Sequence, residues 1–181
     1  MDETAHLQIP LGIVIERREI DNPWIDYTWR PVAVIPGAGP VEEWRCIGAG
    51  EGWRHYHAKT LTLELFRGET EGYLSNLSQP VPAVFIVLRP GEEADEHDVE
   101  PFHVTVCPYE AMGYTEDGEE IVEGVAMPPE IIAMVQAFVD RHHVDEPFRK
   151  RRNKRHRTRD DGRRPDPRIA GTAKYWRVEE K

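Results

Sequence analysis

A dense run of basic residues near the end of the chain is the first candidate for chemistry. The segment RKRRNKRHRTR spans residues 149–159. Side chains of this kind can neutralise the phosphates of a nucleic acid or steer association with an acidic protein. The run contains no aromatic residue and matches no nucleic-acid-binding motif. We therefore expect an electrostatic arm that contacts an acidic protein partner or the chain's own acidic surface, with nucleic acid as the less favoured alternative. The expected contact residues are Arg149, Lys150, Arg151, Arg152, Lys154 and Arg155.

Histidine and cysteine side chains form the second candidate, a metal site. His55 and His57 lie two residues apart, and His103 and Cys107 lie four apart. Four such groups could hold zinc in a tetrahedral site. Strand alternation puts the first pair in phase with Leu61, on the expected inner face, and the second pair out of phase with the apolar residues of its own strand. Only a bulge would bring all four together. We therefore treat them as weak candidates and expect no metal.

Catalytic patterns are absent from the sequence. There is no GxSxG motif, and a strand spacing of four would hold Cys107 and His103 about 13 Å apart. The segment IPGAGPVEEWR contains GxG but has neither the third glycine of a dinucleotide-binding turn nor the lysine of a P-loop. Acidic residues that border the expected strands fit a solvated face better than an acid/base pair; they are Glu64, Glu69 and Glu71. We expect no catalytic residue and no cofactor, and no cofactor-binding residue can be assigned.

Charge divides the chain into two parts. Residues 1–148 contain 9 Lys and Arg against 28 Asp and Glu, a net charge of −19. Residues 149–181 contain 14 against 5, a net charge of +9. Such a shift is typical of a boundary. We predict an acidic domain over residues 1–148, followed by a basic and largely disordered arm over residues 149–181.

Aromatic residues supply candidates for protein contact. Tyr175 and Trp176, within residues 174–178, could anchor the end of the arm. In the acidic domain, Trp24, Tyr27 and Trp29 lie near arginines, a combination typical of interface anchors. The alternative for these three is ordinary packing on the sheet.

The acidic domain reads mainly as β-strands. IPLGIVIERREI, TWRPVAVIPG and EEWRCIGAGEG are expected strands, and Pro31 favours an edge position. Leu61, Leu63 and Leu65 alternate with polar residues in the next strand, and TEGYLSNLSQ is expected to be its partner. PAVFIVLR is apolar on both faces, as in a central strand. FHVTVCPYEA gives one more strand, and YEAMGYTEDGEE a helical turn ending near Gly118.

One helix is predicted over about residues 128–143. It begins at a proline pair, and Ile131, Met134, Val135, Phe138 and Val139 form an apolar stripe. The fold class is therefore α+β, mainly β: an antiparallel sandwich or half-barrel whose sheet is covered by this helix. Cys46 and Cys107 are expected to be buried, reduced thiols. No signal peptide or membrane span is expected, so we predict a cytoplasmic protein.

Five segments together resemble a proteobacterial family of unknown function. They are PLGIVIERREIDNPWIDYTWRPVAVIPG, EGWRHYHAKTLTLELFRGETEGYLSNLSQPVPAVFIVLR, PFHVTVCPYEA, GEEIVEGVAMPPE and AFVDRHHVDEPFRKRR, within residues 9–152. The resemblance implies genes close to those of molybdoenzymes, such as formate-dehydrogenase-like enzymes and their chaperones. Some members carry the label molybdopterin-guanine dinucleotide biosynthesis protein A, but IPGAGPVEEWR does not reproduce the glycine-rich loop of that nucleotidyltransferase.

Charge, composition and resemblance together favour one function. We expect a non-enzymatic cytoplasmic accessory protein that contacts an acidic partner during assembly or maturation of a molybdenum or iron–sulfur enzyme. The partner would be a molybdoenzyme subunit or its chaperone. A nucleic-acid-binding protein that works through the basic run is one alternative. An enzyme or cofactor-binding protein of molybdopterin metabolism is the other.

Overall fold

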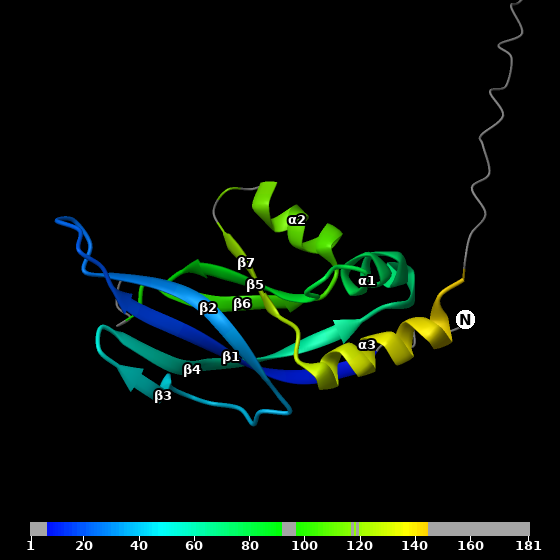
Figure 1. Cartoon of the computed structure of the whole chain (residues 1–181), viewed down its shortest axis with the longest axis horizontal. Coiled ribbons are helices and arrows are strands. Elements are labelled where there is room, and N and C mark those ends of the chain that lie inside the picture. Colours follow the sequence, from blue (N-terminus) through cyan, green and yellow to red (C-terminus); the bar gives the residue numbers. More distant parts are fainter. Residues whose placement is uncertain (1–6, 92–96, 117, 119, 145–181) are drawn as a thin grey trace, which may run out of the picture. The chain divides into compact units, whose positions relative to one another are not determined.

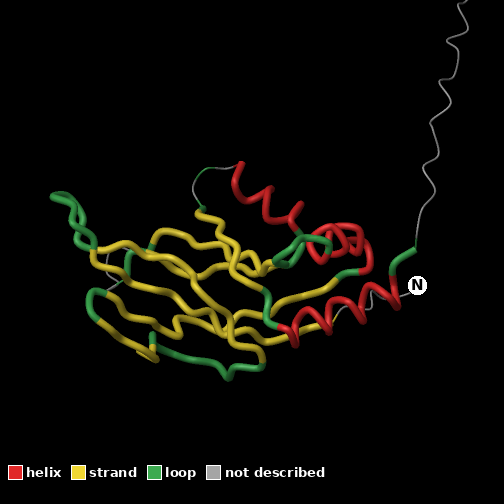
Figure 2. The backbone as a smooth tube through the Cα atoms, viewed as in Figure 1, coloured by secondary structure: helices red, strands yellow, loops and turns green. Residues whose placement is uncertain are grey.

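The structure is a computed structural model that describes residues 7–91, 97–116, 118 and 120–144. Two antiparallel sheets and three α-helices make up these residues (Figures 1 and 2). The strands are β1 (Leu7–Glu19), β2 (Tyr27–Pro36), β3 (Arg45–Gly50), β4 (Trp53–Leu65), β5 (Ala83–Pro90), β6 (Val99–Thr105) and β7 (Ile121–Ala126). The helices are α1 (Thr70–Leu77), α2 (Pro108–Glu116) and α3 (Pro129–His142). The predicted α+β class, mainly β, is confirmed.

The larger sheet has the strand order β2-β1-β4-β3. β1 is an inner strand with side chains buried on both faces, because its β-branched run fills the pleated surface on each side. Leu11, Ile13 and Ile15 point into the core, whereas Glu16 lies buried on the opposite face. β2 forms one edge of this sheet and contains Pro31, as predicted, since an edge strand tolerates the missing N–H.

The smaller sheet has the order β6-β5-β7, so PAVFIVLR is the central strand, as predicted. The two sheets pack face to face, with β6 close to β4 and β7 close to β2. Their apolar inner faces form one core together with α1 and α3. The largest fully buried side chains of this core are Tyr73, Leu11, Ile13, Ile15, Leu63, Leu65, Ile86, Leu88 and Ile131.

α3 matches the predicted helix closely, and it packs chiefly on α1. Four members of its predicted apolar stripe are buried, while Met134 is 43% exposed. α1 corrects the expectation that TEGYLSNLSQ is a strand. Its buried Thr70, Tyr73 and Asn76 recur every three residues, a helical spacing that the short sequence did not distinguish from a strand. α2 extends the helical turn that was expected near Gly118.

A bulge in β4 overturns the predicted orientation of two histidines. Leu61 lies opposite Leu11 of β1, but Ile13 pairs with Lys59 and Val14 with His57, so Ala58 has no partner on β1. One extra residue reverses the alternation of side chains. His55 and His57 therefore lie on the face opposite to the leucines, which is the face of Glu16.

The two cysteines have different environments. Cys107 is buried, as expected for a reduced thiol, and burial is the main cause that raises its pKa. Strand alternation had placed Cys107 out of phase with the apolar residues of its strand, that is, facing away from the core. This orientation was wrong because Cys107 lies beyond the end of β6, where strand alternation no longer applies. Cys46 is exposed, against expectation, because β3 is an edge strand.

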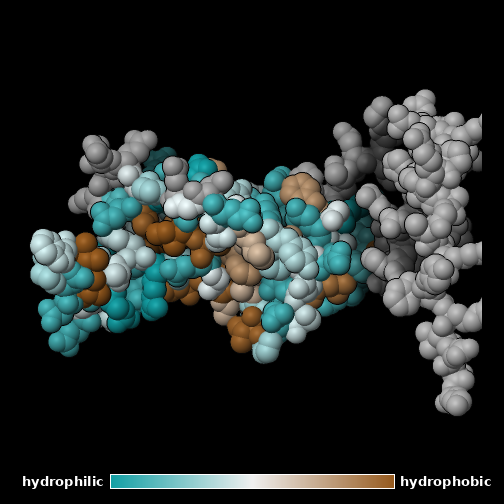
Figure 3. Space-filling model, turned by 90° about the horizontal axis from the view of Figure 1, so that it is seen from above, coloured by the Kyte–Doolittle hydropathy of each residue, from teal (hydrophilic) through white to brown (hydrophobic). Residues whose placement is uncertain are grey.

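Several predictions fall outside the described residues. These are the boundary at residue 148, the disordered arm, its basic contact residues, and Tyr175 and Trp176. Within the described ranges, no helix is both long and apolar enough to cross a bilayer. On the face drawn in Figure 3, hydrophobic side chains lie in separate groups among hydrophilic ones.

Candidate functional site

The hairpin that joins β1 to β2 presents an exposed tryptophan at its tip. Trp24 is 89% exposed, and the neighbouring Ile25 is 51% exposed. The loop is held by local hydrogen bonds: the amide of Trp24 donates to Oδ1 of Asn22 at 2.9 Å, and the amide of Ile20 donates to the carbonyl of Asp26 at 3.1 Å. Packing on the sheet, the alternative for the three aromatic candidates, therefore does not apply to Trp24.

Tyr27 and Trp29 lie further along β2 and belong to a different environment. The guanidinium of Arg17 lies 4.4 Å from the centre of the Tyr27 ring. The indole N–H of Trp29 donates to Asp98 at 2.9 Å, and its ring packs against the core. Both residues lie beside a cleft on the inner face of the larger sheet.

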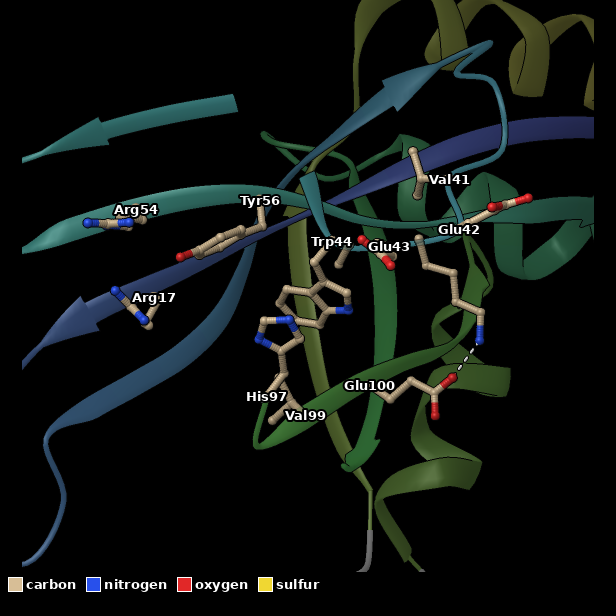
Figure 4. Close-up of a pocket in the computed structure, with 12 residues that line it drawn as sticks. Arg17, Val41, Glu42, Glu43, Trp44, Arg54, Tyr56, His97, Val99 and Glu100 are labelled. Atoms are coloured by element: carbon tan, nitrogen blue, oxygen red, sulfur yellow. Dashed lines mark hydrogen bonds and ion pairs between the residues drawn. The ribbon is translucent and has the colours of Figure 1, made fainter. Parts of the chain in front are cut away.

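This cleft, with a volume of about 850 Å³, opens beyond the edge of the smaller sheet. Its floor is made by β1 and β4, and its walls by residues 41–44, before β3, and residues 97–100, at the start of β6 (Figure 4). We call it the β1–β4 cleft.

Two arginines lie side by side at one end of the β1–β4 cleft. Arg17 and Arg54 are direct partners in the β1–β4 register, so their side chains share a face. Both line the cleft, and Figure 4 shows the Tyr56 hydroxyl pointing toward them. Among the described residues, no carboxylate lies within ion-pair distance of either guanidinium.

Aromatic rings and carboxylates make up the rest of the cleft. Trp44 stacks on His97 with ring centres 3.9 Å apart, and Tyr56 lies 5.9 Å from Trp44. At the end away from the arginines lie Glu42, Glu43 and the ion pair of Lys59 with Glu100, whose atoms are 2.6 Å apart (Figure 4). The cleft is therefore cationic at one end, aromatic in the middle and anionic at the other end.

The opposite face of the larger sheet carries a compact charge cluster around Glu16. Arg18 donates two hydrogen bonds to this carboxylate, at 2.9 and 3.0 Å. Arg30 and His55 add contacts at 3.1 and 3.0 Å. The Arg18 hydrogen bonds are the main cause that lowers the pKa of Glu16 to about 2, with burial acting against them. Each charge here has a partner, which indicates a structural role.

The four weak metal candidates do not form one site. His55 contacts Glu16, and His57 contacts the Thr60 hydroxyl at 3.0 Å on the same face. His103 contacts Glu110 of α2 at 2.9 Å, and the hydrogen bond of His103 is the main cause that lowers the pKa of this glutamate. Cys107 lies in the core. The part of the chain that the structure describes contains no group of three or more side chains suited to hold a metal.

The three carboxylates that were considered for acid/base chemistry are also separate. Glu64 accepts a hydrogen bond from Gln8 at 2.8 Å, and Glu69 accepts one from the buried Tyr73 hydroxyl at 3.0 Å. Glu71 is exposed on α1. We find no paired carboxylates among them.

Reasoning from the sequence did not identify Arg17, Trp44, Arg54 or Tyr56 as a group. They come from three separate segments that only the strand register brings together. The alternation of Arg54 and Tyr56 in WRHYH was the available signal, but its face could be assigned only once the bulge at Ala58 was known.

Comparison with known proteins gives one match. A family model described as a protein of unknown function, DUF3305, matches residues 10–152. No curated protein and no solved structure matches the chain. Because the match covers most of the sequence, the chain belongs to the DUF3305 family of proteins of unknown function.

Proposed function

We propose that this protein is a non-enzymatic accessory protein that acts by protein–protein contact, with the hairpin tip as its anchor. The observation that carries the proposal is the 89% exposure of Trp24 on a hydrogen-bonded loop. Tryptophan gives up more apolar surface to a partner than any other side chain, and interface energy concentrates in a few such residues. A tip held in one conformation loses little entropy on binding.

Charge favours an acidic partner. The sequence of the basic run, residues 149–155, supplies six cationic side chains. Such charges mainly raise the rate of association and make it sensitive to salt. The resemblance noted from the sequence suggests a molybdoenzyme subunit or its chaperone as this partner. The contact would then belong to assembly or maturation of a molybdenum or iron–sulfur enzyme in the cytoplasm.

The proposal is tested by capture from the native cell extract with the full-length protein and with Trp24→Ala. Met112→Ala is a matched control, because Met112 is a large exposed apolar residue on α2. Neither variant should lose more than about 0.5 kcal/mol of stability, since both side chains are exposed. We expect a molybdoenzyme subunit or chaperone, identified by mass spectrometry, with the full-length protein and the control, and at least about tenfold less with Trp24→Ala.

Nuclease treatment of half of each sample separates the main alternative. Captured proteins that disappear with nuclease would indicate a nucleic-acid-binding protein that works through the basic run. Equal capture by Trp24→Ala and Met112→Ala would remove the hairpin tip from the interface and overturn the proposal.

A further inference from the structure

The two faces of β1 give neighbouring arginines different electrostatic surroundings. Arg18 is paired with Glu16 on one face. On the other face, Arg17 stands directly across from Arg54, and like charges in this arrangement repel each other. Among the described residues neither guanidinium forms an ion pair, although the Glu19 carboxylate lies nearby and lines a small pocket with both arginines. An anion between the two guanidinium groups would convert the repulsion into attraction.

We propose that the β1–β4 cleft binds a phosphate monoester that carries a planar ring, of the nucleoside monophosphate class. This site is independent of the hairpin tip. Two guanidinium groups match the double charge of a phosphate monoester near neutral pH. The ring of Tyr27 stacks on one face of the Arg17 guanidinium. The N–H groups lie in the guanidinium plane, so this stacking still allows them to donate bidentate hydrogen bonds to phosphate oxygens.

We infer the planar ring of the ligand from the aromatic side chains in the middle of the cleft. Tyr56 lies between the arginines and the carboxylates and is only partly buried, next to Trp44, one face of which is stacked on His97 (Figure 4). Aromatic side chains next to a cationic groove are typical platforms for nucleobases. A volume of about 850 Å³ lies within the usual range for sites of small ligands.

The anionic end of the cleft limits the ligand further. Glu42 and Glu43 are exposed hydrogen-bond acceptors, suited to amino and imino groups of a base. Glu100 is engaged by Lys59, so it is less available. A triphosphate chain would bring additional negative charge into a strongly acidic domain. The cleft should therefore favour one phosphate group over three.

Titration calorimetry with the full-length protein tests this proposal. The probes are AMP, GMP, ATP, adenosine and inorganic phosphate. We expect a monophosphate nucleotide to bind at least about tenfold more tightly than inorganic phosphate or adenosine, because only the nucleotide engages both the arginines and the rings. It should also bind more tightly than ATP.

Two variants locate the site. Arg54→Gln changes an exposed side chain, so folding should be retained, and it should weaken nucleotide binding at least about tenfold. Arg141→Gln, at an exposed position on α3, is the matched control and should bind as the unchanged protein does. Tyr56→Leu should weaken nucleotide binding while leaving phosphate binding unchanged. Circular dichroism checks the fold of each variant.

Three outcomes would overturn the proposal. The first is no binding of any nucleotide at about 1 mM, a concentration that reveals even weak sites. The second is equal affinity for nucleotide and inorganic phosphate, which means an adventitious ion only. The third is displacement of the nucleotide by a hexaglutamate peptide at equal concentration, which would assign the arginines to protein docking. None of these outcomes affects the test of Trp24.

Discussion

Glu16 is the central acidic residue of the charge cluster on the outer face of the larger sheet. Its carboxylate is buried and accepts hydrogen bonds from Arg18, Arg30 and His55. Replacing it by glutamine removes the negative charge and turns an amide N–H₂ toward cationic groups. We expect Glu16→Gln to lower the free energy of unfolding by about 1–3 kcal/mol at neutral pH. Urea denaturation checks this, with the exposed Glu116→Gln as control, which should change little.

The same residue should give the protein a recognisable acid dependence. The pKa of Glu16 is lowered in the folded state from 4.5 to about 2. A lowered pKa stabilises the fold at pH values above 4.5, and this contribution is lost as the pH falls from 4.5 toward about 2. The difference in stability between the unchanged protein and Glu16→Gln should therefore shrink from pH 6 to pH 2.5. A difference that stays constant over this range would contradict the assigned role.

At the scale of elements, the connection from β2 to β3 leaves little space above β1. β2 and β3 form opposite edges of the sheet, so the chain must pass from one edge to the other, and Ala38 and Gly39 lie over the outer face of β1 and β4. Gly12 of β1 lies under this crossing: a Cβ atom there would come within 2.8 Å of Ala38 and 2.7 Å of His57. The Thr60 hydroxyl donates to the carbonyl of Gly39 at 2.7 Å and fixes the crossing from β4.

This geometry predicts a specific pattern of stabilities. Gly12→Ala should cost about 1–3 kcal/mol, because the crossing chain and His57 must both shift. Ala38→Gly removes one of the two close neighbours. The double variant should therefore be more stable than the sum of the two single effects predicts, a coupling that a double-mutant cycle from chemical denaturation measures. Additive effects, or an unchanged stability of Gly12→Ala, would show that the loop does not press on Gly12.

The sequence predicted helices and strands correctly where the hydrophobic pattern was long. It did not predict which face of the sheet a side chain occupies where a bulge interrupts the strand. β5 and α3 were predicted correctly because six consecutive apolar residues, 83–88, and an apolar stripe along a 14-residue helix leave little ambiguity. The eight residues of α1 are too few to separate the two periodicities. In β4, the extra residue Ala58 reversed the faces of His55 and Tyr56. The pattern of polar and apolar residues in this strand does not reveal the bulge. The face on which Arg54 and Tyr56 lie, and with it the β1–β4 cleft, was therefore not predicted.

At the scale of the whole molecule, charge is the most uneven property. Residues 1–148 carry a net charge of −19, and the complete chain carries −10. The apolar core of the described residues, in contrast, extends from Ile9 to Val139. Residues 149–181 are rich in charged side chains, so we expect them to affect long-range electrostatics more than hydrophobic stabilisation.

A chain that ends at Phe148 separates these two contributions. We expect its melting temperature at physiological salt to lie within about 3 °C of the full-length value, because the apolar core is unchanged. At low salt it should melt at a lower temperature than the full-length protein, since self-repulsion of the acidic domain is no longer offset by the positive charges of residues 149–181. Added salt screens this repulsion, so the difference should close between about 10 and 300 mM NaCl. Calorimetry of both chains across that range measures the effect. If the shortened chain still melts at a much lower temperature at high salt, residues 149–181 contribute to packing. The boundary in charge at residue 148 would then not be a boundary between independently folding parts.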